Sequence, residues 1–245
     1  LPEAIADVLP EQAKHIEKLR SQLLAHFLSY GYEPVIPPMI QYLDSLLIGG
    51  GSDLELQTFT LVDQLSGKTL GVRADMTPQA ARIDAHLLKN NEINRLCYCG
   101  SVLRTQPTHL LGSREMIQMG AEMFGCDQIE ADQESLALLL TALGKVGLSH
   151  LLIDLCHAGL VESLLDDCQL DQVTENALHL DLADLRGYHY HTGLMFTVYV
   201  QGLNKVNSVT NPIAYGGRYD GVGEGFGRTR PAVGFSFDLL QLSEM

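Results

Sequence analysis

The chain has 245 residues, 46% of them hydrophobic and 19% charged, and this composition predicts one large domain with a sizeable core. Lys and Arg number 16 and Asp and Glu 30, so the formal net charge of −14 disfavours a nucleic-acid binder, which neutralises phosphates with basic residues. The sequence contains no apolar run long enough to span a membrane and no signal-peptide pattern at its start, so we expect a cytoplasmic protein with no membrane partner.

The five cysteines are odd in number and include no Cys-x-x-Cys pair, which predicts free thiols rather than a disulfide framework or a zinc site. Cys97 and Cys99 are expected to face the same side of a strand, as small core residues do. His189 and His191 stand two residues apart, but no third ligand follows at a useful spacing. We therefore predict no metal and no cofactor.

The first elements in chain order are a helix and an extended segment. Residues 10–31 carry apolar side chains at helical spacing after Pro10, which predicts a helix. Residues 34–38 are rich in proline, which drives the preceding residue into the β region and suits a sheet edge or a subunit boundary. Residues 58–62 and 69–73 flank a Ser-Gly pair and are predicted to form a hairpin.

Thr77 is predicted to cap a helix that runs to about Lys89, with Pro78 in its first turn. The glycine-rich segments 49–51 and 223–227 lack the strand–helix context of a phosphate loop, so we expect mobile loops there. The order of elements has no repeating βαβ pattern, which predicts the α+β class. The remaining predictions are strands at 95–100 and 116–124, a helix at 130–146, a short buried strand at 150–155, a helix at 158–165, and strands at 193–200, 212–216 and 232–237.

Five groups of segments, in the right order, resemble the histidyl-tRNA synthetases, a class II aminoacyl-tRNA synthetase family. Each is weak alone, but together they cover nearly the whole chain in register. The resemblance implies a class II-like antiparallel sheet flanked by helices across residues 1–245, and a homodimer formed through residues 34–38. The segments are residues 5–10, 32–37, 100–104 with 118–125, 185–193, and 216–221 with 231–235.

The departures from this family bear on catalysis. The second class II motif reads Arg-x-Glu in the family, whereas here Arg104 is followed by Gln106 in place of the acid. The third motif supplies an arginine for the γ-phosphate of ATP, and Gln241 stands at the matching position. A neutral amide does not replace a cation opposite a triphosphate. With the chain ending at Met245, we expect no anticodon-binding domain, no tRNA partner and no catalysis.

The resemblance implies that the amino-acid pocket is kept. Asp75 and Thr77 match the groups that hold the ammonium of histidine, and Arg186 matches the arginine that holds its carboxylate. The alternative is that Gln118 and Glu122, on a predicted strand, face outward. Arg104 and Arg186 would then belong to surface ion pairs. A histidine at position 191, where the family has a tyrosine, departs from the pattern. The full implied histidine-binding set is Asp75, Thr77, Arg104, Gln118, Glu122, Arg186, Tyr190, His191 and Tyr219.

A synthetase-like chain without its catalytic residues resembles the regulatory subunits of ATP phosphoribosyltransferase. That resemblance implies a hetero-oligomer with the short-form catalytic subunit, histidine as the ligand, and activation and feedback control of the first step of histidine biosynthesis. The helical insertion that the family has near residues 166–180 is expected to be shortened or missing. Two alternatives stay open: a divergent enzyme that still forms histidyl-adenylate, and a relative that binds another metabolite, as His191 suggests.

Overall fold

The computed structural model describes residues 1–49, 51–107, 112–157, 191–200 and 212–245. The predicted helix at 158–165, the expected shortening near 166–180, and Arg186, His189 and Tyr190 all lie outside these ranges. Within the described ranges, no helix combines the length and the apolar character that crossing a membrane requires.

A seven-stranded sheet forms the centre of the molecule, in the order β1-β5-β6-β10-β9-β8-β7. Every neighbouring pair is antiparallel except β1 and β5, so the predicted α+β class and mainly antiparallel sheet are confirmed. The strands are β1 (Glu33–Pro34), β5 (Asn94–Leu103), β6 (Glu115–Phe124), β7 (Leu151–His157), β8 (Leu194–Val200), β9 (Ala214–Arg218) and β10 (Ala232–Asp238).

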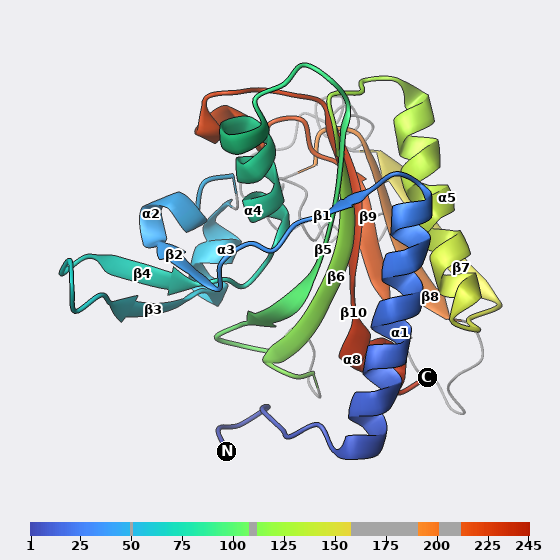
Figure 1. Ribbon diagram of the computed structural model, residues 1–245, viewed down its shortest axis with the longest axis horizontal. Helices are drawn as coiled ribbons and strands as arrows, with labels where there is room; N and C mark the ends of the chain where they lie inside the picture. The colour runs from blue at the N-terminus through green and yellow to red at the C-terminus, as the bar shows by residue number, and fades with distance from the viewer. Residues whose placement is uncertain (50, 108–111, 158–190, 201–211) are drawn as a thin grey trace, which may run out of the picture.

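Two long helices, α1 (Pro10–Ser29) and α5 (Ile129–Lys145), lie side by side over one face of this sheet (Figure 1). Their apolar faces close the larger core together with the short helix α8 (Leu239–Ser243). Cys97 is buried in that core and Cys99 packs against it, which confirms that both face the same side of β5. The apolar spacing of residues 10–31 thus predicted the correct helix.

The opposite face carries α4 (Thr77–Arg82), which continues as the π-helix η1 (Ile83–Leu88), and a smaller three-stranded sheet (Figure 1). The smaller sheet has the order β2-β4-β3, and its β3–β4 hairpin is the one predicted from the sequence. A second core fills the space below α4 and includes Met76, Tyr98 and Tyr219. The remaining elements on this side are β2 (Ile40–Tyr42), α2 (Leu43–Leu46), α3 (Gly51–Gln57), β3 (Phe59–Val62) and β4 (Thr69–Val72).

Two local predictions outside the candidate site were wrong. The strand predicted to be buried, β7, is an edge strand with Leu152 44% and Leu155 59% exposed, because no further strand of the described chain pairs with it. The glycine-rich segments are not simple loops: α3 begins at Gly51, and a short 3-10 helix, η2 (Glu224–Phe226), lies within the second segment. A Cβ added at Gly49 would lie 2.8 Å from Cγ1 of Val222, so this glycine allows the two segments to pack against each other.

Candidate functional site

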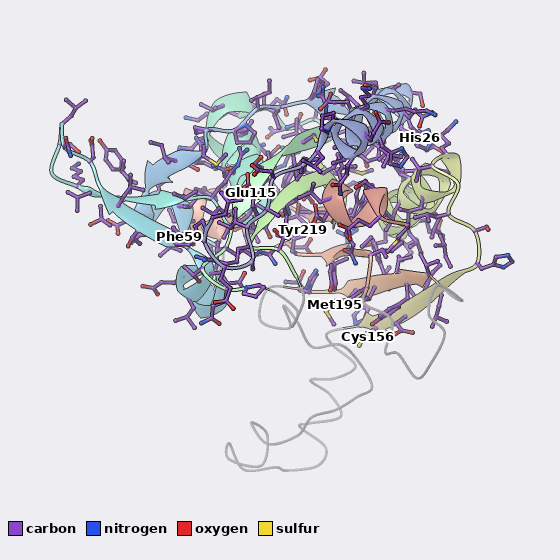
Figure 2. All side chains as sticks on the ribbon, turned by 90° about the horizontal axis from the view of Figure 1, so that it is seen from below. His26, Phe59, Glu115, Cys156, Met195 and Tyr219 are labelled. Carbon is purple, nitrogen blue, oxygen red and sulfur yellow. The ribbon has the colours of Figure 1, made fainter. Side chains whose placement is uncertain are left out.

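A buried carboxylate, that of Glu122 on β6, is the centre of the site, and its residue is only 1% exposed. Its Oε1 accepts hydrogen bonds from the hydroxyls of Thr77 at 2.9 Å and Tyr98 at 2.8 Å. Its Oε2 accepts one from the hydroxyl of Tyr219. The three donors come from α4, β5 and the residue after β9, so the cluster ties three elements of the fold to one acid. Figure 2 places Tyr219 in the interior of the molecule, away from the β7–β8 edge marked by Cys156 and Met195.

Gln118 extends this network from the same strand, four residues earlier and therefore on the same face. Its Oε1 accepts a hydrogen bond from the backbone N–H of Met76 at 2.8 Å. Its Nε2 donates to Oδ1 of Asp75 at 2.9 Å and to Oγ of Ser236 at 3.1 Å. The side chain is 5% exposed, so the two predicted strand residues, Gln118 and Glu122, face inward and the alternative of an outward orientation is wrong.

Thr77 does not cap α4 as predicted. The first turn of the helix is instead stabilised by Asp75, whose Oδ1 accepts the backbone N–H of Thr77 at 2.8 Å. The hydroxyl of Thr77 is thereby free to turn toward Glu122, and it also lies 2.9 Å from the hydroxyl of Tyr98. The turn before α4 thus presents an acid and a hydroxyl to the same space.

Two glycines make room for the buried carboxylate. Gly234 on β10 is the register partner of Glu122, and a Cβ added there would overlap the carboxylate. Gly120 is the register partner of Tyr98, and a Cβ there would lie 2.5 Å from the tyrosine hydroxyl. A side chain at either position would displace the acid or its donor.

The electrostatics of the cluster are those of an acid removed from water. Burial raises the pKa of Glu122 to about 8, while the hydroxyls of Tyr219, Tyr98 and Thr77 lower it and the nearby Asp75 carboxylate raises it further. Burial and the neighbouring Glu122 also raise the pKa of Tyr98. Among the described residues, no Lys, Arg or His side chain forms a hydrogen bond or ion pair with this carboxylate.

A cavity of about 300 Å³ adjoins the network and shares Gln118 and Ser236 with it. Arg104 also lines this cavity, and its Nε donates to the backbone oxygen of Ala74 at 3.3 Å. The lining further includes two carboxyl groups, those of Asp238 and Glu244. Burial raises the pKa of Asp238 to about 6. The cavity is therefore a mixed-charge pocket that shares two side chains with the network.

Of the two positions that depart from the synthetase motifs, Gln241 lies at this cavity and Gln106 lies outside it. Gln241 lines the cavity, and its Nε2 donates to the backbone oxygen of Pro212 at 3.0 Å. Gln106 is exposed and is not among the lining residues. A group of three or more His, Cys, Asp or Glu side chains suited to a metal ion does not occur within the described ranges.

The structure brings most of the predicted site together. Asp75, Thr77, Gln118, Glu122 and Tyr219 form one network, and Arg104 lines the adjoining cavity. His191 lies outside the network, against Gly217, where an added Cβ would be 2.6 Å from its Cδ2. Arg186 and Tyr190 lie outside the described residues.

Sequence reasoning missed Tyr98 and Ser236. The one available signal for Tyr98 was the glycine at position 120 inside a strand, since such a glycine marks the close approach of another group. The identity of that group depends on the register between β5 and β6, which pairs Tyr98 with Gly120.

Comparison with known sequences identifies the same family that the sequence motifs resemble. Residues 4–180 and 169–242 match the family described as histidyl-tRNA synthetase. An ATP phosphoribosyltransferase regulatory subunit from Burkholderia mallei is 44% identical over an alignment that is 317 positions long and covers 100% of this chain and 81% of the relative. A protein of the same name from Burkholderia pseudomallei gives the same values.

Solved structures share the fold. The Bacillus halodurans protein described as an ATP phosphoribosyltransferase regulatory subunit/histidyl-tRNA synthetase superimposes with a TM-score of 0.83 at 25% identity, covering 100% of this chain and 82% of that one. The apo histidyl-tRNA synthetase of Staphylococcus aureus gives 0.75 at 22% identity, covering 99% and 69%. These similarities confirm the predicted class II synthetase-like fold.

Proposed function

The chain belongs to the histidyl-tRNA synthetase family, among relatives that are ATP phosphoribosyltransferase regulatory subunits, and we propose that it binds free histidine and regulates a catalytic ATP phosphoribosyltransferase subunit without catalysing a reaction itself. The observation that carries this proposal is the network of Asp75, Gln118 and Glu122 beside a cavity in which Arg104 is the one cationic side chain among the described lining residues.

The polar groups of the site suit an amino acid with a nitrogen ring. Histidine offers an ammonium group, a carboxylate and two ring nitrogens, so it needs acceptors for its N–H groups and a cation for its carboxylate. Asp75 and Glu122 supply acceptors, and Gln118 supplies both a donor and an acceptor. Arg104 lines the cavity, and its guanidinium can hold a carboxylate. A cavity of about 300 Å³ is of the size that a small ligand occupies.

Adenylate formation is the alternative function, and the cavity disfavours it. A triphosphate is bound by several cations that neutralise its charge in the ground state and the transition state. Here Arg104 shares the cavity with the carboxyl groups of Asp238 and Glu244, and the amide of Gln241 is engaged with a backbone oxygen. ATP–pyrophosphate exchange in the presence of histidine tests this point, and robust exchange would refute the regulatory function.

A regulator without chemistry acts through differential affinity for two states of a complex. We expect this chain to assemble with the short-form catalytic subunit and to raise its activity. Histidine bound at the network should then shift the complex toward a less active state. By reciprocity, any effect of histidine on the binding of the partner must appear as an equal effect of the partner on histidine affinity.

The test combines calorimetry with an activity assay on the mixed proteins. Glu122→Ala leaves the ligand's N–H group buried without its acceptor, so histidine affinity should fall by about a hundredfold or more, roughly 3 kcal/mol. The same variant should lose feedback inhibition while still raising phosphoribosyl transfer by the catalytic subunit. Glu134→Ala is the matched control, because that glutamate pairs with Arg95 at 2.8 Å outside the site and its loss should leave histidine affinity unchanged.

Each part of the proposal has its own contradicting result. Failure of the two purified proteins to co-elute, or equal phosphoribosyl transfer with and without this chain, would refute the regulatory function. Undiminished feedback in Glu122→Ala would place the histidine sensor on the catalytic subunit.

A further inference from the structure

Three oxygen atoms of the site form a closed triangle: the hydroxyl oxygens of Thr77 and Tyr98 and the carboxylate oxygen Oε1 of Glu122. The hydroxyl of Thr77 lies 2.9 Å from that of Tyr98, and each of the two lies within 2.9 Å of Oε1 of Glu122. Every side of the triangle is therefore a hydrogen-bond distance. The other carboxylate oxygen accepts from Tyr219, which stands outside the triangle.

The number of protons available decides whether the triangle is complete. Thr77 and Tyr98 bring one hydroxyl proton each, so an ionised Glu122 leaves two protons for three sides. Both protons then point at the carboxylate, and the two hydroxyl oxygens face each other with lone pairs only. A protonated Glu122 supplies the third proton, and each group can donate once and accept once around the ring.

We propose that Glu122 is protonated while the site is empty, completing the triangle with Thr77 and Tyr98, so that ligand binding releases a proton, and that Tyr98 is a positioning residue which sets the pH of this release. This inference rests on the proposed function for the identity of the ligand, histidine. The proton balance is simple: the carboxylic acid of Glu122 gives its proton to solvent and becomes the carboxylate that accepts an N–H of the bound ligand. The ligand gains and loses no proton in this step.

The groups around Glu122 support the protonated form. Tyr98 faces it from β5, Tyr219 from the end of β9, and Asp75 from the turn before α4, while Gly234 of β10, which lies against the carboxylate, carries no side chain. Tyr32 is another titratable group affected by this acid: burial raises the pKa of Tyr32, and the charges of Glu134 and Glu122 raise it further. None of these groups is a cation, and burial together with Asp75 raises the pKa of Glu122 to about 8.

The first test is calorimetry of histidine binding at pH 7 in phosphate and in Tris, two buffers with different heats of ionisation. A difference in binding heat between the buffers measures the protons released. We expect about one proton from the natural chain, because a group with a pKa near 8 is mostly protonated at pH 7. Glu122→Gln has no proton to release from this position, so it should bind histidine more weakly and show no such release.

The second test separates the role of Tyr98 from simple packing. At pH values below the pKa of Glu122, the histidine affinity of the natural chain should increase about tenfold for each unit by which the pH is raised. This increase is measured relative to Glu122→Gln, in which the titration of histidine itself is still present. Tyr98→Phe removes one donor to the carboxylate, and the loss of that hydrogen bond raises the pKa of Glu122. The pH at which affinity stops rising should therefore move upward. Tyr32→Phe removes a buried hydroxyl outside the triangle and should leave this pH profile in place.

The outcomes distinguish this inference from the proposed function. Histidine binding without proton release in the natural chain, or an identical pH profile in Tyr98→Phe, would overturn the inference and leave the proposed function standing. Absence of histidine binding would overturn both. Carbon-13 NMR of labelled glutamate in the protein without ligand measures the ionisation state of Glu122 directly, with its signal assigned by comparison with Glu122→Gln. This measurement needs neither histidine nor a Tyr98→Phe variant that folds. A Glu122 carboxyl already ionised at pH 6 would refute the inference.

Discussion

The environment of Glu122 differs from that of most buried acids, which are compensated by a basic partner. Among the described residues, the partners of the Glu122 carboxylate are three hydroxyl groups. Hydrogen bonds from such neutral donors stabilise a carboxylate less than an ion pair with additional hydrogen bonds does. The family resemblance, and not the spacing of Gln118 and Glu122 by itself, predicted that these two polar side chains face inward. It was not enough to predict Tyr98, because a tyrosine in a strand is equally consistent with a core position.

The raised pKa of Glu122 predicts a pH-dependent stability. Because its folded-state pKa of about 8 lies above the ordinary value of 4.5, its contribution to stability is fully present below about pH 4.5 and is lost as the pH rises through about 8. The free energy of unfolding of the natural chain should therefore fall relative to Glu122→Gln over that interval, by on the order of a few kcal/mol. Urea unfolding of both proteins at several pH values measures the difference, to which Asp238 contributes nothing because it is present in both. Parallel curves from pH 4.5 to 8 would contradict the prediction.

At the scale of elements, the sequence predicted those helices and strands that have a local apolar pattern, and it did not predict those that depend on tertiary context. Helix α1 and strands β5, β6 and β10 were predicted within a few residues, because their apolar spacing is long enough to be distinctive. The short elements α2, β2 and α8 were missed. Such short segments carry too few residues for a periodic signal, and their formation depends on neighbours: α8, for example, begins where Asp238 accepts the backbone N–H of Leu240 at 3.0 Å.

The end of α5 gives a prediction that isolates backbone effects. Gly144 lies within the helix with open space around it, whereas Gly147 follows the helix with a φ of +92° and stabilises its end by a hydrogen bond from its N–H to the oxygen of Gly144. Gly144→Ala should raise the free energy of unfolding by about 0.5 kcal/mol, because alanine loses less backbone entropy in a helix. Gly147→Ala should lower it by about 1 kcal/mol, because its left-handed conformation is unfavourable for alanine.

Thermal or urea unfolding of the two variants beside the natural chain measures both effects. Each glycine serves as the control for the other, since the two lie three residues apart and the same methyl group is added. Equal shifts of the same sign would show that side-chain packing, not backbone conformation, dominates at this helix end.

At the scale of the whole molecule, the smaller sheet has one covered and one open face. Gly71 on β4 faces α2, where an added Cβ would lie 2.7 Å from Cδ2 of Leu46. The register of the sheet aligns Tyr42, Leu70 and Leu61 across the opposite face. Tyr42 is 47% and Leu61 40% exposed, and Ile36, in the proline-rich segment just before, is 95% exposed. The sequence predicted this segment as a subunit boundary, but the apolar face beside it became visible only from strand register.

We predict that a second copy of this chain covers that face, as the dimer expected for residues 34–38 requires. Leu61→Asp would bury a charge without a partner in such an interface, which costs several kcal/mol and should weaken the dimer by at least about a hundredfold. Size-exclusion chromatography with light scattering should show the natural chain as a dimer and Leu61→Asp as a monomer at micromolar concentration, with circular dichroism confirming that the variant folds. Leu155→Asp is the matched control, because Leu155 is an exposed leucine on β7, at the other end of the molecule (Figure 1), and its change should leave the dimer intact. A monomeric natural chain, or a dimeric Leu61→Asp, would place the contact between copies elsewhere or remove it.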